Sequence, residues 1–210
     1  MEEFAESEWL PAFEKHRKLL AQIYKKIEED PLPVYPKKEN LFRALKYLEP
    51  KDVKVVLLGL DPYYREGQAI GFSFAVSRSC PTPPSLRNIM TELRNEGYTV
   101  ESNQITRWIR RGVLLLNAFL CVSEGKSLSY KEWRPFTLHI MRIVVEKNPN
   151  CVFLLLGNEA KNFTQELRKM GATRFVSAGH PSPMSVRFFY GSGCFKKVQK
   201  LVGGDFTWNL

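Results

Sequence analysis

The chain has 210 residues, of which 44% are hydrophobic and 25% are charged, and this is ordinary for a globular protein with one substantial core. The 31 lysines and arginines outnumber the 22 acidic residues, and the net charge of +9 favours a polyanionic partner, although a basic protein without such a partner shows the same balance. The sequence shows no signal peptide and no long apolar span, so we expect no membrane association and an intracellular soluble protein of the cytoplasm or nucleus.

The four cysteines are too far apart in the sequence to suggest a metal centre. They are Cys80, Cys121, Cys151 and Cys194, and no two of them form a CxxC pair. We therefore expect reduced, mostly buried thiols, and we expect neither a metal nor another cofactor.

The first 35 residues have the pattern of a helix followed by a proline-rich connection. Apolar side chains at helical spacing predict one amphipathic helix over residues 7–29, with Pro11 tolerated in its first turn. The prolines between Pro31 and Pro36 end that helix. We interpret this part as structural.

Residues 36–210 hold the motifs, and because the chain shows no repeat or linker we treat 1–210 as one domain. This part begins with a second predicted helix, marked by Leu41, Leu45 and Leu48 and ending at Pro50.

A short β-branched run from Val53 to Leu58 predicts a strand buried on both faces, and Gly59 allows a sharp turn at its carboxyl end. Asp61 follows where ligands of α/β sheets usually bind, and Pro62 stiffens the loop that holds it. An ordinary turn with an Asp-Pro pair would have the same local sequence.

A proline-rich turn at 80–84 precedes Ser85, which stands where a helix N-cap belongs. A serine there either caps the helix or also offers a phosphate its hydroxyl together with the amides of the helix N-terminus.

Three further apolar runs predict strands, each followed by a polar loop. They are 112–120, 151–156 and 173–178, and between and after them we expect helices at 135–147, after an Asn158 cap, and at about 193–202. The alternation of strands and helices predicts an α/β fold with three α/β/α layers around a central, four-stranded, mostly parallel sheet.

Asp61, Asn117 and His180 each end a separate predicted strand, so an acid, an amide and an imidazole should face one crevice. Each has a plain structural explanation when taken alone: a turn aspartate, an amide satisfied by the protein, and a loop histidine.

Five motifs, in order, resemble those of family 1 uracil-DNA glycosylases. They are GLDPYYREGQAIGFSF (59–74), PTPPSLRN (81–88), LLLNAFL (114–120), LLLGNEA (154–160) and HPSPMS (180–185). In that family they are the water-activating loop, the proline-rich loop, the uracil-recognising strand, the Gly-Ser loop and the minor-groove intercalation loop. The resemblance extends from about Pro36 to the C-terminus.

The resemblance implies a monofunctional hydrolase that releases uracil from single- or double-stranded DNA, leaves an abasic site and so initiates base excision repair. Asp61 would activate the water, and neutral His180 would hydrogen-bond uracil O2. Asn117 would pair with N3–H and O4, a pattern that cytosine cannot offer. Tyr63 would exclude the thymine methyl, Phe74 would stack on uracil, and the backbone amide of Leu60 would reach O2.

The same resemblance implies the DNA contacts and a monomeric protein. Met184 would enter the space that the flipped base leaves. The expected contacts with the DNA strand beside the flipped nucleotide are Pro84, Ser85, Asn158, Ser182 and Ser185.

The chain departs from the family pattern at several positions. Leu60 stands for the usual Gln, Tyr64 for His, Asn158 for Ser and Met184 for Leu, and Arg187 comes one position early, with Phe188 in the expected place of the arginine. Two alternative functions remain open at this point: a catalytically silent DNA-binding homologue, and a glycosylase with a shifted base preference.

Overall fold

The structure, a computed structural model, describes residues 4–210 and is built on a four-stranded sheet in which all neighbouring strands are parallel. In sheet order the strands are β3 (Val113–Asn117), β2 (Val55–Gly59), β5 (Val152–Leu156) and β6 (Arg174–Ala178). This confirms the predicted fold class, and each strand lies within its predicted apolar run or extends one residue beyond it.

Burial explains why these segments form strands. Every residue of β2, β3 and β5 is buried, as expected for parallel strands covered on both faces. The edge strand β6 is only partly buried, which is why it tolerates Arg174 and Ser177.

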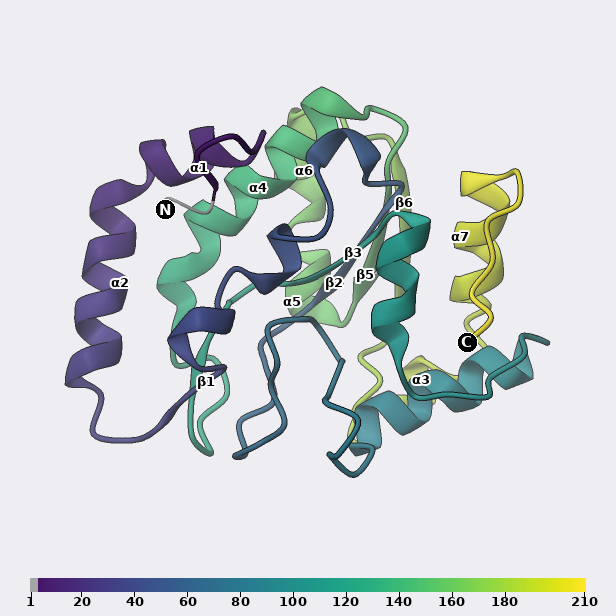
Figure 1. Cartoon of the computed structure of the whole chain (residues 1–210). Helices are drawn as coiled ribbons and strands as arrows, with labels where there is room; N and C mark the ends of the chain where they lie inside the picture. The colour runs from purple at the N-terminus through teal and green to yellow at the C-terminus, as the bar shows by residue number, and fades with distance from the viewer. Residues whose placement is uncertain (1–3) are drawn as a thin grey trace.

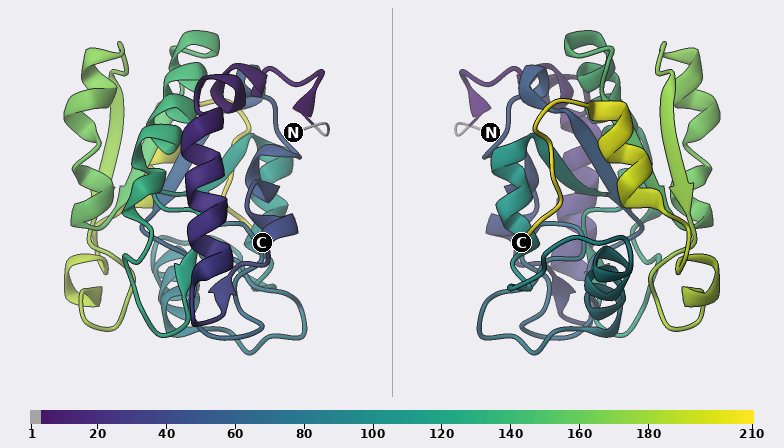
Figure 2. Two further views of the ribbon diagram at one scale, coloured as in Figure 1. Left: turned by 90° about the vertical axis from the view of Figure 1, so that its left-hand side faces the viewer. Right: turned by 90° about the vertical axis from the view of Figure 1, so that its right-hand side faces the viewer.

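Helices cover both faces of the sheet and give three layers (Figures 1 and 2). One layer holds α1 (Leu10–Lys15), α2 (Arg17–Glu29), α4 (Arg134–Lys147) and α6 (Thr164–Lys169). The other holds α3 (Pro84–Asn95), the 3₁₀ helix Ile105–Arg111 and α7 (Cys194–Val202). A short helix, α5 (Asn158–Lys161), follows β5.

Aromatic side chains fill the core on each side of the sheet. Phe13 of α1 packs on Phe136 of α4 with ring centroids 5.3 Å apart. On the other side, Trp108 and Trp208 meet edge to face at 4.8 Å. The Trp108 indole N–H donates to the Trp208 carbonyl at 3.0 Å and holds the C-terminal segment against the core.

Two predictions for the N-terminal part were wrong. The single helix over 7–29 is two helices, α1 and α2, separated at His16, whose backbone (φ −103°, ψ 16°) leaves the α-helical geometry. The second predicted helix does not form; the 38–52 region contains three short 3₁₀ turns instead. Leu41 and Leu45 are nevertheless buried, so the spacing correctly indicated apolar packing but not the element.

A small antiparallel ribbon was not predicted. It joins β1 (Val34–Tyr35) to β4 (Val122–Ser123), and each strand has only two residues. The ribbon brings the segment after α2 beside the segment that follows β3. Within residues 4–210 no helix is both long and apolar enough to cross a membrane.

Candidate active site

The predicted site residues lie at the carboxyl ends of the four parallel strands and in the segments that follow them. Gly59, the last residue of β2, pairs in register with Asn117, the last residue of β3. The backbone N–H of Ala118 donates to the Gly59 carbonyl at 3.0 Å, so the two strand ends stay together. Gly157 is likewise tied to the end of β6 by its N–H, which donates to the Ala178 carbonyl at 3.1 Å.

Gly59 is the point at which Asn117 and Phe74 meet. A Cβ at position 59 would lie 2.7 Å from Asn117 Oδ1 and 3.0 Å from the Phe74 ring. Any side chain there would therefore displace both groups. Both side chains are largely buried, Asn117 at 7% and Phe74 at 8% exposure.

Phe74 is held in an unusual backbone conformation. Its φ of 59° lies in the left-handed region, which is costly for an aromatic residue and is frequent at functional sites. The Tyr63 hydroxyl donates to the Phe74 carbonyl at 3.1 Å, which ties the two aromatic residues to each other.

His180 completes this group. Its ring centroid lies 5.6 Å from that of Phe74, and a Cβ on Gly157 would lie 3.0 Å from its own Cβ. Nδ1 accepts the backbone N–H of Ser182 at 3.1 Å, so the ring proton is on Nε2, which is free to donate to a ligand. Burial lowers the pKa of His180 to about 4, which keeps the imidazole neutral near pH 7.

Asp61 is fixed by a loop that sequence reasoning did not connect with the site. Its Oδ2 accepts the Ser127 hydroxyl at 2.6 Å and the Leu128 N–H at 2.8 Å. Burial raises the pKa of the Asp61 carboxyl, and these two hydrogen bonds act in the opposite direction. No motif in the sequence marks Ser127 or Leu128.

Leu60 and Tyr64 flank this acid. Leu60 is half-buried against the core, and its carbonyl accepts the Phe119 N–H at 3.0 Å. Tyr64, which replaces the family histidine, is exposed, and its carbonyl accepts the Gly125 N–H at 3.0 Å.

The predicted DNA contacts lie at two helix starts and in one loop. Pro84 and Ser85 are the first two residues of α3, and Asn158 is the first residue of α5. The expected caps at Ser85 and Asn158 were wrong, since Pro83 and Gly157 hold those positions and neither helix has a side-chain cap. The prolines set the entry of α3 because their fixed φ suits its first turn.

The loop after His180 projects one apolar side chain far into solvent. Met184 is 93% exposed, whereas Ser182 and Ser185 beside it are partly buried. Phe188 is also exposed, and the Arg187 guanidinium lies 4.6 Å from its ring centroid.

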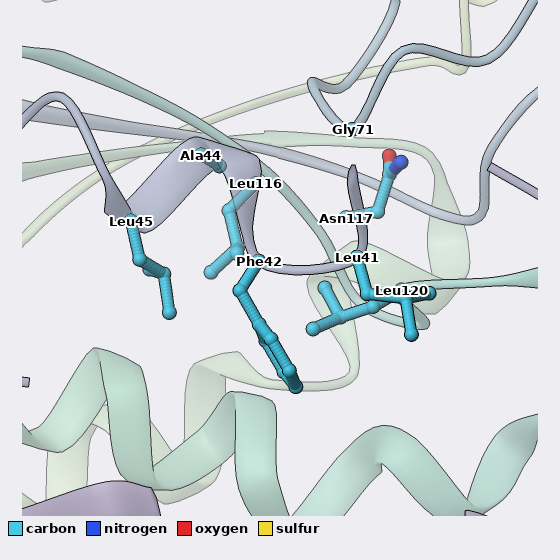
Figure 3. Close-up of a pocket in the computed structure, with 8 residues that line it drawn as sticks. All are labelled: Leu41, Phe42, Ala44, Leu45, Gly71, Leu116, Asn117 and Leu120. Carbon is cyan, nitrogen blue, oxygen red and sulfur yellow. The ribbon is translucent and has the colours of Figure 1, made fainter. Parts of the chain in front are cut away.

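A narrow cavity lies behind Asn117 (Figure 3). Its volume of about 10 Å³ is that of about one water molecule. The amide of Asn117 points away from Phe42 and Leu120, two of the apolar side chains that line it. Asn117 joins this cavity to the group around Gly59, whereas Asp61 and His180 do not line it.

The described residues, 4–210, contain no group of three or more His, Cys, Asp or Glu side chains that could hold a metal ion. All four cysteines are free thiols, three of them buried, as predicted. Burial raises the pKa of Cys121, Cys151 and Cys194 to about 12, so these thiols are not reactive near neutral pH.

Comparisons with known proteins agree with the resemblance of the motifs. Residues 45–200 match the model of the uracil DNA glycosylase superfamily. The chain is 36% identical to the uracil-DNA glycosylase of Bacillus anthracis strain A0248, covering 95% of this chain and 92% of the relative. It is 38% identical to that of Bacillus cereus strain ATCC 10987, covering 96% and 93%.

Solved structures show the same fold. The crystal structure of mimivirus uracil-DNA glycosylase superposes with a TM-score of 0.84 at 23% identity, covering 97% of this chain and 86% of that one. A variant of the mimivirus protein in complex with UGI superposes with a TM-score of 0.70 at 26% identity, covering 84% and 70%.

Proposed function

The chain belongs to the uracil-DNA glycosylase superfamily, and we propose that it works as a family 1 enzyme with Asp61 and His180 as its catalytic pair. It is a uracil-DNA glycosylase, a hydrolase that cleaves the N-glycosidic bond of deoxyuridine in DNA, releases free uracil and leaves an abasic site for base excision repair. The observation that carries the proposed mechanism is the meeting of Asn117 and Phe74 at Gly59, two residues before Asp61, with the His180 ring beside that of Phe74.

The two proposed catalytic residues act on opposite ends of the bond that breaks. As the C1′–N1 bond lengthens, positive charge develops on the deoxyribose and negative charge on the uracil. The Asp61 carboxylate stabilises the first charge and accepts a proton from the attacking water. The Nε2–H of His180 donates to uracil O2 and stabilises the second, so uracil leaves as an anion.

Base recognition would come from the groups around Gly59. The Asn117 amide accepts from uracil N3–H and donates to O4, while cytosine presents the opposite pattern and leaves both groups unpaired, a rejection on the order of 10⁴-fold. Phe74 stacks on the base, and the Leu60 backbone N–H donates to O2. Tyr63, tied to the Phe74 carbonyl, occupies the place that a thymine methyl would need.

Contacts with the strand would come from the helix starts and the loop after His180. Ser85, Asn158, Ser182 and Ser185 present backbone N–H and side-chain groups to phosphates, while Pro84, which has no N–H, contacts the strand through its ring. Met184 enters the stack in place of the flipped base. We further propose a single domain over residues 1–210 that acts as a monomer on single- and double-stranded DNA.

Release of free uracil from a uracil-containing oligonucleotide tests the function directly, with thymine- and cytosine-containing strands as controls. Under single-turnover conditions Asp61→Asn and His180→Leu should each slow release by about 10²-fold or more, while binding to uracil-DNA changes less. A variant that keeps the wild-type rate would remove its residue from the proposed pair.

Activity in EDTA tests the assignment of Asp61 to water rather than to a metal. We expect full activity. Activity that is lost in EDTA and returns with a divalent cation would contradict the mechanism. Binding to DNA without any release of uracil would point to the silent homologue, and release of another base would point to a shifted preference.

A further inference from the structure

The loop after β4 donates two hydrogen bonds to the Asp61 carboxylate, and both go to the same oxygen. Ser127 Oγ–H and Leu128 N–H both donate to Oδ2, at 2.6 and 2.8 Å. Neither of these two donors bonds Oδ1. Short hydrogen bonds to a carboxylate are stronger than those between neutral groups, so this pair decides how the carboxylate is turned.

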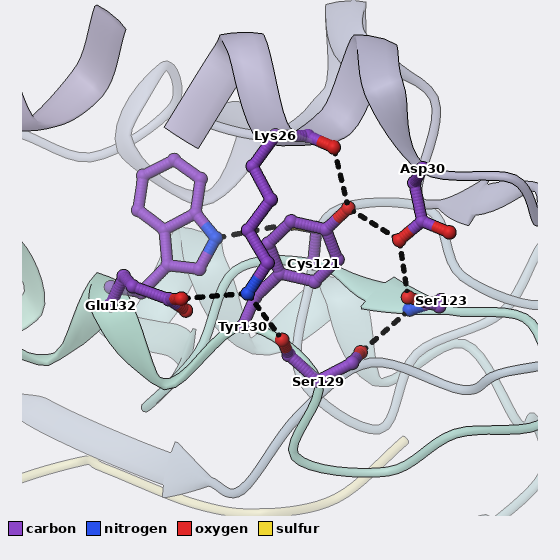
Figure 4. Close-up of polar contacts among 8 residues, drawn as sticks. Lys26, Asp30, Cys121, Ser123, Ser129, Tyr130 and Glu132 are labelled. Carbon is purple, nitrogen blue, oxygen red and sulfur yellow. Dashed lines mark hydrogen bonds and ion pairs between the residues drawn. The ribbon is translucent and has the colours of Figure 1, made fainter. Parts of the chain in front are cut away.

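The donor loop is itself held in one conformation. Leu128 has a φ of 61°, a left-handed backbone that costs a branched residue on the order of 1 kcal/mol or more and persists only where surrounding contacts impose it. The contacts at the two ends of the loop explain how it is imposed (Figure 4).

Asp30, at the end of α2, ties both ends of the loop together. Its Oδ2 accepts the hydroxyl protons of Ser123 and Tyr130, each at 2.7 Å. Ser129 Oγ accepts the Ser123 N–H at 2.8 Å, and Lys26 donates to the Ser129 carbonyl at 2.9 Å. Lys26 of α2 and Asp30 after it thus hold both ends of the segment from Ser123 to Tyr130, which includes Ser127 in the sequence (Figure 4).

We propose that Ser127 is a positioning residue for Asp61. The Ser127 hydroxyl holds Oδ2 of Asp61 so that Oδ1 faces the hydrolytic water, and the same hydrogen bond stabilises the charged form of the carboxylate. The proposal rests on the proposed catalytic role of Asp61. It gives the enzyme a side-chain donor at a site where the exposed Tyr64 replaces the family histidine.

Removal of the Ser127 hydroxyl should change the pH dependence of the reaction as well as its rate. Burial raises the pKa of Asp61 and the hydrogen bonds lower it, so losing one of them raises it further. The other titratable groups of the region are Tyr63, Tyr64, Arg65 and Glu66 on the same loop, Glu124, Lys126 and Tyr130 on the donor segment, Lys26 and Asp30 that hold this segment, and His180 after β6. None of them is changed by a substitution at 127.

The test is single-turnover uracil release from a single-stranded oligonucleotide between pH 4.5 and 9, by wild type, Ser127→Ala and Ser127→Thr. We expect Ser127→Ala to lower the plateau rate by about 10-fold, the loss of one hydrogen bond to a charged group, and to move the acidic midpoint to higher pH. Ser127→Thr keeps the hydroxyl and should restore both values.

Ser79→Ala is the matched control. The Ser79 hydroxyl shares a hydrogen bond of 3.1 Å with the Ser77 hydroxyl and has no role in the proposed site. Ser127→Cys keeps the size of the side chain with a weak donor, and should reproduce both changes if Ser127→Ala folds poorly. A wild-type rate and acidic midpoint in Ser127→Ala or Ser127→Cys would overturn the proposal. Failure of wild type to release uracil would instead overturn the proposed function.

Discussion

The side-chain amide of Asn88, in α3, donates a hydrogen bond of 2.7 Å to the backbone carbonyl of Pro181 in the loop that carries Met184. The Tyr190 hydroxyl donates to the Oδ1 of the same Asn88 at 2.8 Å. One side chain therefore holds the loop near both of its ends. The contact therefore couples α3, which begins with the proposed DNA contacts Pro84 and Ser85, to the loop of Met184, the apolar side chain proposed to fill the gap left by the flipped base.

Asn88→Asp keeps the acceptor for Tyr190 but removes the donor to Pro181, while Tyr190→Phe does the reverse. Each should cost about 1 kcal/mol of stability, the usual net contribution of one hydrogen bond, with the aspartate costing more because a carbonyl faces a carboxylate. Cleavage of duplex substrate should fall more in Asn88→Asp, because Pro181 is adjacent to His180. Thermal melts and single-turnover cleavage measure both effects, and a wild-type melt and rate for Asn88→Asp would show that the contact is dispensable.

Tyr63→Ala should open the base pocket to thymine. The ring fills space and its hydroxyl only tethers the Phe74 carbonyl, so Tyr63→Phe is the matched control and should still exclude thymine. We expect slow but detectable thymine release from Tyr63→Ala alone. Without the ring, the pocket discriminates between uracil and thymine only by its contacts with one methyl group, which are worth about 1–3 kcal/mol. Thymine release by both variants, or by neither, would contradict steric exclusion by the ring.

Asn117→Asp should allow some release of cytosine. A carboxyl in place of the amide can accept from the exocyclic amine of cytosine and, when protonated, donate to N3. The largely buried position favours the protonated acid, so cytosine release should increase as the pH is lowered. Assays on cytosine-containing strands at two pH values measure this, and no release from a folded variant would place Asn117 outside the base pocket.

Met184→Ala should impair cleavage of duplex more than of single strands. An apolar wedge fills the gap that base flipping leaves, and that gap is best defined within a duplex, where unstacking costs a few kcal/mol. Met184→Leu keeps apolar bulk with a more defined shape and should remain active. Matched oligonucleotides at fixed salt give the comparison, because phosphate contacts make affinity salt-dependent; equal losses on both substrates would contradict the wedge.

Acidification below about pH 6.5 should destabilise the fold through its histidines. The pKa of His180 and of His139 is lowered to about 4, in both cases chiefly by burial, and that of His16 is lowered too. The unfolded state, with an ordinary histidine pKa near 6.5, therefore binds more protons between that pH and about 4, and stability falls across this window as the pH falls. Above it the contribution is fully present.

Urea unfolding at pH 7 and pH 5 measures this loss. His139→Gln removes one of the three groups and lies outside the proposed site, where its ring packs 5.3 Å from that of His16. The variant should lose less stability than wild type between the two pH values. An equal loss would mean that His139 does not contribute.

The sequence by itself determined the sheet and the candidate site residues. Apolar runs such as Val53–Leu58 predict buried strands, and three of the runs are followed by a glycine, Gly59, Gly157 or Gly179, which allows the turn that places a polar residue at the sheet edge. Asn117 and His180 could therefore be assigned to one crevice, because parallel strands deliver their carboxyl ends to the same side. The role of His180 in catalysis and that of Asn117 in base recognition stay predictions, carried by the resemblance of the motifs.

Only the tertiary structure decided what holds these residues in place. The break at His16, the β1–β4 ribbon and the contacts of Ser127 and Asn88 depend on partners far away in the chain, and Ser127 is 66 residues from Asp61. A serine or asparagine in a loop has the same local pattern whether it meets water or a carboxylate. Hydrogen bonds of this kind are set by packing, after the strands have brought the loops together, and no local periodicity records them.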